Sequence, residues 1–268
     1  MGRLNKNIFM KSRPIYNILL LLFLFLLSEE VNSQTSIRVL SINTRMSGQM
    51  VGYSATPFAD YIRQYDPDFI MLQEVDYRTA RNGLKDFTTE LSSELGLFSA
   101  FGYALQYTQG EYGVAILSKY PIEKIANTQL IGNAAEMKEK RTVLYIDAII
   151  PATNVKIRLA VTHLDHSTDG VRQSMVQQLN SAIGASIPTL LTGDFNAKPS
   201  ETAISVGMAS WQRICNNFAT YPASSPSSKI DYIFAKPSGS WTVKSYQVLT
   251  NTTTITDHCA LLTDVELN

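Results

Sequence analysis

The sequence predicts one mixed α/β domain that follows a short N-terminal leader. Short apolar runs of the β type alternate with helical patterns from Ser36 onward. The 268 residues are 45% hydrophobic and 17% charged, which is enough apolar material for a large core and excludes a disordered chain. No internal repeat recurs along the chain, so a repeat architecture is excluded as well.

Each element follows from a local pattern. Residues 37–42 predict a strand with Ile37, Val39 and Ser41 on one face, because strand side chains alternate. Apolar residues at helical spacing predict helices over 56–65, 86–95 and 169–185, the last capped by Thr168 or Asp169, and a short helix over 201–210. The other expected strands are 68–73, 98–105, 113–118, 122–130, 141–150, 155–163, 187–192, 229–235, 241–249 and 259–267.

Residues 1–33 have the three parts of a secretory signal peptide. Four basic residues precede the apolar run 18–27, and a small residue, Ser33, stands at the exit. A helix of that run would be about 15 Å long, half of a bilayer core, so no stable membrane span is expected. We therefore expect a secreted or periplasmic domain over 34–268; the alternative is an uncleaved N-terminal membrane anchor.

The charge balance argues against a protein that coats polyanions. The chain has 23 Lys and Arg against 23 Asp and Glu; removing the four basic and two acidic residues of the leader leaves 19 and 21, a net charge of −2. The two cysteines, Cys215 and Cys259, are too few for a disulfide scaffold or a four-thiolate zinc site. The sequence leaves open whether they pair or stay free.

Polar residues stand at the ends of successive expected strands. Carboxylates and histidines backed by apolar strands form a rigid floor on which chemistry can be built. The residues in question are Asn43, Glu74, Thr162–His163, Asp194 with Asn196, Asp231, and Asp257–His258.

In this order, these residues resemble the endonuclease/exonuclease/phosphatase superfamily, which has the DNase I-like fold. Gln73-Glu74-Val75, the run 113–118 followed by Pro121, and the run 229–233 are similar to further signatures of that family. The resemblance covers roughly residues 36–268. It implies an α/β (α+β) four-layer sandwich, in which two facing mixed β-sheets are flanked by helices. It also implies hydrolysis of a phosphoester with Mg²⁺, for which Mn²⁺ can substitute.

The resemblance also implies roles for single residues. Glu74, Asn43 and Asp257 are the expected metal ligands, which agrees with the preference of Mg²⁺ for oxygen. Asp194 and His258 share the acid and base roles, without a fixed division between them. Asp231 is expected to orient His163, and Asn196 to donate to a phosphoryl oxygen. Glu111 is expected to hold His258; the other interpretation is a solvated residue at a strand start.

Two arginines are candidates for binding the substrate. Arg141 stands where the family tends to have an Arg that reaches phosphate, although it also continues the charged run 138–140. Arg45 replaces an Asp found in some nuclease members, which leaves one or two metal ions open. We interpret His166 as a surface or rim residue.

The sequence therefore predicts a secreted, metal-dependent phosphodiesterase, a monomer acting on a small or lipid-borne phosphodiester. The alternative is a secreted DNase-like endonuclease, which would grip nucleic acid through a strip of basic residues formed by Arg45, Arg78, Arg81 and Lys85. A third reading is a binding module that has lost activity. The substrate class is not determined, because the fold hosts several and the selecting loops are hard to interpret.

Overall fold

The computed structural model describes residues 1–2, 35–133, 135–151 and 153–268. Apart from its first two residues, the expected signal peptide over 1–33 lies outside the described residues, and it stays a prediction. Within the described ranges, no helix is both long enough and apolar enough to cross a membrane.

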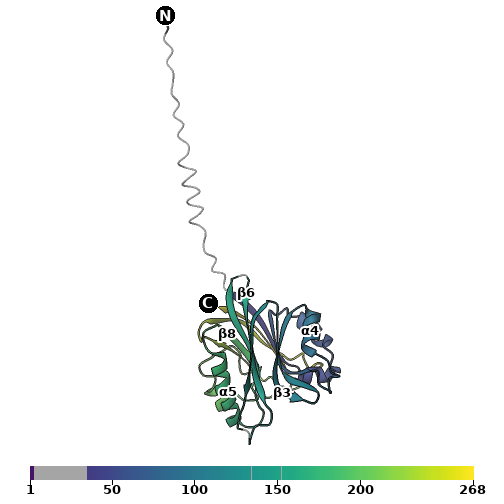
Figure 1. Cartoon of the computed structure of the whole chain (residues 1–268). Coiled ribbons are helices and arrows are strands. Elements are labelled where there is room, and N and C mark those ends of the chain that lie inside the picture. Colours follow the sequence, from purple (N-terminus) through teal and green to yellow (C-terminus); the bar gives the residue numbers. More distant parts are fainter. Residues whose placement is uncertain (3–34, 134, 152) are drawn as a thin grey trace. The chain divides into compact units, whose positions relative to one another are not determined.

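Two six-stranded mixed sheets make up the centre of the domain (Figure 1). The first has the order β11-β12-β1-β2-β4-β3 and the second β5-β6-β7-β8-β10-β9. The strands of the first sheet are β1 (Thr35–Asn43), β2 (Phe69–Tyr77), β3 (Phe98–Tyr107), β4 (Gly110–Ser118), β11 (Trp241–Leu249) and β12 (Ala260–Leu267). Those of the second are β5 (Ile122–Leu130), β6 (Arg141–Ile150), β7 (Val155–His163), β8 (Thr189–Asp194), β9 (Gln212–Arg213) and β10 (Asp231–Lys236).

Helices cover the outer face of each sheet. α4 lies on the first sheet and α5 on the second, as Figure 1 shows. The helical segments are α2 (Arg45–Gly48), η1 (Gln49–Val51), α3 (Thr56–Arg63), α4 (Phe87–Leu95), α5 (Asp169–Ile183) and α6 (Thr202–Ser205). Thr168 caps α5, since its side chain accepts from Val171 N. The helix expected over 201–210 is wrong beyond Ser205, where Val206 and Gly207, both poor helix formers, follow.

The side chains of β1 show how the layers are held together. Ile37 and Val39 point into the core between the sheets, whereas Leu40 and Ile42 pack on the outer side with Phe58 of α3. This alternation is the one that the sequence predicts for a strand buried on both faces. Every β1 residue just named is buried. The predicted four-layer sandwich of two facing sheets and flanking helices is therefore confirmed.

Gly193 is required where β7 and β8 run side by side. A Cβ at this position would overlap the carbonyl oxygen of Thr162, its register partner. We expect Gly193→Ala to lower the free energy of unfolding by about 1–3 kcal/mol and to reduce activity, because His163 and Asp194 are the next pair in the same register. Thermal unfolding and turnover measurements check this. Gly170→Ala in α5 is the matched control: its Cβ would meet only Thr168 Oγ1, at 3.9 Å, so a loss of stability there as large as at Gly193 would contradict the close-approach explanation.

Candidate active site

The functional side chains come from strand ends of both sheets. β1 and β2 are parallel and so are β7 and β8, which brings Asn43, His163 and Asp194 to strand ends close to Glu74, which lies inside β2. β10 is antiparallel to β8, and its first residue, Asp231, lies directly opposite Asp194. Glu74, His163 and Asp194 line a cavity of about 340 Å³ at this edge. The expectation that strand ends carry one site therefore agrees with the structure.

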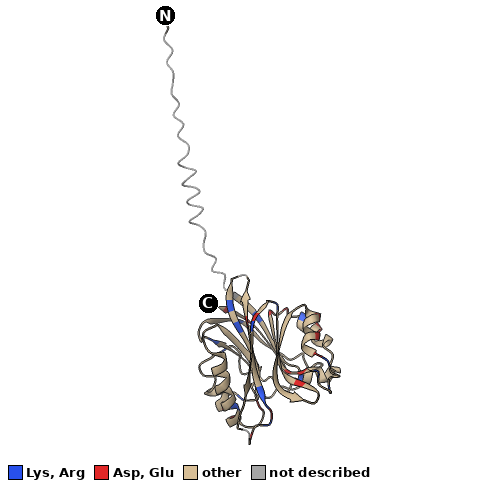
Figure 2. Ribbon diagram, viewed as in Figure 1, with Lys and Arg blue, Asp and Glu red and all other residues tan. Residues whose placement is uncertain are grey.

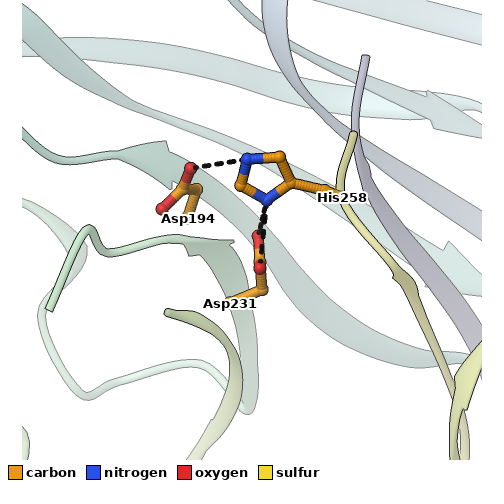
Figure 3. Close-up of side chains that lie close together, drawn as sticks. All are labelled: Asp194, Asp231 and His258. Carbon is orange, nitrogen blue, oxygen red and sulfur yellow. Dashed lines mark hydrogen bonds and ion pairs between the residues drawn. The ribbon is translucent and has the colours of Figure 1, made fainter. Parts of the chain in front are cut away.

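His258 lies between two carboxylates (Figure 3). Its Nδ1 is 3.2 Å from both carboxylate oxygens of Asp231, and its Nε2 is 3.7 Å from Asp194 Oδ2. Burial alone would lower the pKa of His258, but the charge and hydrogen bond of Asp231, with Asp194, raise it to about 10. At neutral pH the ring is therefore an imidazolium that presents Nε2–H to Asp194.

Asp194 is a carboxylate with a raised pKa. Burial is the largest cause and repulsion by Asp231 adds to it, while His258 acts in the opposite direction, and the result is a pKa of about 7. Its Oδ1 accepts from the backbone N–H of Asn196, and its Oδ2 accepts from Asn43 Nδ2 at 3.2 Å. These two donors fix the carboxylate, so that it faces the cavity in one orientation. A buried carboxylate whose pKa is close to 7 is suited to general base catalysis.

His163 has the opposite protonation state. Its Nδ1 lies 3.1 Å from Nη1 of Arg141, a group that only donates. Its Nε2 lies 3.0 Å from Asn196 Nδ2, also a donor, and 3.6 Å from Asp194 Oδ2. Burial, and then the charge of Arg141, lower the pKa of His163 well below its ordinary value. His163 is thus a neutral imidazole.

The expected partners of the two imidazoles are corrected by this geometry. Asp231 was expected to orient His163, but it holds His258 instead, because the β8–β10 register places it beside Asp194 and away from Arg141. The expectation that Glu111 holds His258 is also wrong. Glu111 lies in β4 opposite Tyr77 and Gln106, and none of the contacts of His258 within the described residues involves it.

Glu74 occupies an irregular position at the end of the site. The β2–β4 register shifts between Leu72 and Val75, and Glu74 has a left-handed φ of 58° in that bulge. Its Oε1 accepts from Asn43 Nδ2 at 3.1 Å and its Oε2 from Met46 N at 3.2 Å. Bulges of this kind redirect a side chain out of the regular pleat, here into the cavity.

The carboxylate of Glu74 suits a divalent cation. Its contacts are neutral N–H donors, and within the described part of the chain no ion pair neutralises it. Asp257 also lines the cavity, while pairing with Arg45 at 3.1 Å. Asn43 uses its Oδ1 to accept from Arg45 N and gives its amide nitrogen to the carboxylates. Oxygen donors of this kind fit Mg²⁺; the individual ligand assignments stay predictions.

A second group of ligating atoms lies deeper. Asp194, Asp231 and His258 each offer one atom, and these lie within 4.8 Å of one another. Both ring nitrogens of His258 face carboxylates, however, and the imidazole stands between the two aspartates (Figure 3). Its ring nitrogens are therefore engaged by carboxylates, whereas the oxygens of Glu74 face neutral N–H donors.

Arg141 is held in place by the segment that precedes it, which a buried aspartate fixes. Asp165, fully buried, accepts from the backbone N–H groups of Lys138 and Glu139 at 3.0 and 2.7 Å. Glu139 in turn pairs with Nη2 of Arg141 at 2.8 Å. Arg141 is only 3% exposed and lines the cavity, and its Nε is buried without a partner among the described residues. A nearly buried cation on the cavity wall suits a phosphate oxygen.

The cavity wall also contains residues that were not predicted as site residues. Tyr221 packs on His258 with ring centroids 4.7 Å apart, and Arg81, Tyr107 and Tyr112 form another part of the wall. His166 lines the same cavity, in agreement with its interpretation as a rim residue. In the sequence, the tyrosines at 103, 107 and 112 are the feature that corresponds to this part of the wall, although their spacing does not distinguish site residues from core residues.

Carboxylates and imidazoles thus gather at one edge of a two-sheet sandwich. The sequence model described as the Endonuclease/Exonuclease/phosphatase family matches residues 40–258, so the chain belongs to that family and the predicted resemblance is confirmed.

Several known proteins are similar to this chain at different levels. The uncharacterized protein YbhP of Escherichia coli K12 is 34% identical over 100 residues, which covers 36% of this chain and 38% of YbhP. A Bacteroides vulgatus endonuclease/exonuclease/phosphatase structure has a TM-score of 0.71 at 19% identity, covering 87% of this chain and 100% of that one. The Bacteroides thetaiotaomicron mannosyl-6-phosphatase has a TM-score of 0.68 at 19% identity, covering 85% and 99%. At such identities the structural matches establish the fold.

Proposed function

We propose that the protein is a metal-dependent hydrolase of small phosphate esters, with phosphodiesters as the predicted class and Mg²⁺ as the metal. The observation that carries this proposal is Asp194. It is a buried carboxylate with a raised pKa, fixed between a cationic and a neutral imidazole inside a cavity. One imidazole beside this carboxylate is cationic and the other is neutral. Groups whose protonation states differ in this way can take separate acid and base roles.

The residues divide the chemistry as follows. Asp194 takes the proton of the attacking water, since its unprotonated form is available near neutral pH. His258, kept cationic by Asp231, stabilises the negative charge that develops beside it. Arg141 is the donor for a phosphoryl oxygen, and His163 lies beside it in the cavity wall.

Glu74 is the residue that we assign to the metal, together with Asp257. A bound Mg²⁺ polarises a phosphoryl oxygen and offsets its charge. Asn43 acts by holding the carboxylates of Glu74 and Asp194 in place through its amide nitrogen.

The size of the cavity and the state of the basic residues favour a small substrate over a duplex. About 340 Å³ is at the lower end of the range for small-molecule sites. Two members of the strip of basic residues are occupied internally: Arg45 pairs with Asp257, and Lys85 donates to Tyr53 O. Figure 2 shows Lys and Arg distributed over several elements. These contacts leave few cations for a phosphate backbone.

Parallel assays test the proposal. The purified protein is incubated with Mg²⁺ or with EDTA, and with bis(p-nitrophenyl) phosphate, p-nitrophenyl phosphate, a phospholipid diester or supercoiled DNA. We expect EDTA-sensitive turnover of a small diester with DNA left intact, and loss of that turnover in Glu74→Gln, which keeps the shape of the side chain without its charge.

Two outcomes would contradict the proposal. Salt-sensitive cleavage of DNA without turnover of the small esters would favour the endonuclease alternative. Turnover that is equal in EDTA and in Mg²⁺, or unchanged in Glu74→Gln, would exclude the metal role.

We also propose that the protein is exported from the cell's cytoplasm through its N-terminal leader. The leader over 1–33 has the composition of a cleaved signal peptide. We expect N-terminal sequencing of the exported protein to begin close to Gln34; a mature protein that retains the apolar run 18–27 would instead support the membrane anchor.

A further inference from the structure

Arg81 is fixed on the cavity wall by a carboxylate with no exposed surface. Asp76 is 0% exposed, and its two oxygens accept from Nε and Nη2 of Arg81, each at 2.7 Å. A bidentate pair of this kind sets both the position and the plane of the guanidinium. Arg81 itself lies in the loop between β2 and α4 and keeps 20% of its side chain exposed.

Two aromatic rings hold the same guanidinium from another side. Its central carbon lies 4.1 Å from the ring centroid of Tyr107 and 5.4 Å from that of Tyr112. All three residues line the cavity that contains His163 and Asp194. The clamp formed by Asp76, Tyr107 and Tyr112 therefore immobilises the guanidinium of Arg81 on the cavity wall.

One nitrogen of this guanidinium, Nη1, is not held by Asp76. The hydrogen bonds of Arg81 within the described residues use Nε and Nη2 only, and Nη1 is not among the buried atoms that lack a partner. Nη1 is therefore an accessible donor of a cation, and ordering it for a ligand has little further entropic cost, because the clamp has already immobilised the side chain.

The other charges of the cavity wall are largely matched with each other. Glu139 pairs with Arg141, and Asp257 with Arg45. Glu74 is the carboxylate that we assign to the metal. A ligand group that reaches Arg81 therefore meets a fixed donor rather than an excess of carboxylates.

We propose that Arg81 determines specificity by binding a second anionic group, a carboxylate or phosphate, on the part of the substrate remote from the scissile phosphorus. This inference rests on the proposed function, because it takes His163 and Asp194 to mark the reacting end of the cavity. The substrate class becomes a small phosphoester that carries a further negative charge.

Titration calorimetry of ligand binding to the Mg²⁺-loaded protein tests the role of Arg81. The probes are ω-phosphonocarboxylates of increasing chain length, such as phosphonopropionate, with alkylphosphonates and ω-hydroxyalkylphosphonates of matched length. We expect at least one carboxylate to bind about 10- to 100-fold more tightly than its alkyl match, as a charged hydrogen bond permits. The ratio of the affinity for the carboxylate to that for its alkyl match should fall to about 1 in Arg81→Gln and recover in part in Arg81→Lys.

Arg78→Gln is the matched control. Arg78 belongs to the same loop but lies over the ring of Tyr77, at 5.5 Å, and is not part of the wall of the active-site cavity. Three results would overturn the inference. The first is an affinity ratio that is equal in the wild type and in Arg81→Gln at every chain length. The others are equally tight binding of the hydroxyl series and no binding of any carboxylate. Calorimetry does not depend on turnover, so a protein that binds these probes through Arg81 but hydrolyses no ester would contradict the proposed function alone.

Discussion

Asp194→Asn is expected to lower kcat on a small phosphoester by about 10²–10⁴-fold, the usual loss when a general base is removed. The amide retains the size of the carboxylate but cannot take a proton from water. Asn43 Nδ2 and Asn196 N both donate to Asp194, and one amide oxygen can satisfy only part of that demand. KM should change much less than kcat, because the lost interaction belongs to the transition state.

Steady-state kinetics with Mg²⁺ and circular dichroism check this result together. The control is Asp60→Asn, which replaces an exposed aspartate of α3 that pairs with Arg63 on the surface. Full activity in a folded Asp194→Asn protein would remove Asp194 from the reaction.

The strands could be predicted well because their signal is local. The alternation of side chains along residues 37–42 identifies β1 as a strand, and the structure shows that both of its faces are buried. The bulge of β2 at Glu74 could not be seen, since a left-handed residue there depends on the pairing with β4. The strand expected over 68–73 consequently continues to Tyr77.

The members of the site were predictable, whereas their pairing was not. Asp231 and His258 lie far apart in the sequence, and only the β8–β10 register shows which imidazole the carboxylate reaches. From the distribution of charged residues alone, Arg81 is predicted as part of a strip of basic residues. Its buried partner Asp76, five residues earlier, becomes apparent only in three dimensions.

Asp231→Asn is expected to have the second large effect, through His258 rather than through direct contact with the reacting atoms. The amide can still accept from Nδ1–H, so the orientation of the ring is kept while the negative charge is lost. Burial then dominates and lowers the pKa of His258 from about 10. In the wild type, the ring of His258 stays protonated at every pH below its raised pKa. The variant therefore loses the imidazolium as the pH rises through its new, lower pKa, and kcat at neutral pH falls by about 10²–10⁴-fold.

NMR of the imidazole nitrogens in EDTA measures this directly, free of any effect of bound metal. In the wild type the His258 ring should remain protonated through neutral pH, whereas in Asp231→Asn it should titrate below neutrality. His163 is the internal control, because Arg141, not Asp231, faces its Nδ1, and its ring should stay neutral in both proteins. If His258 keeps its high pKa in the variant, Asp194 alone must hold the charge. Asp231 would then be a residue that fixes the ring position without setting its protonation.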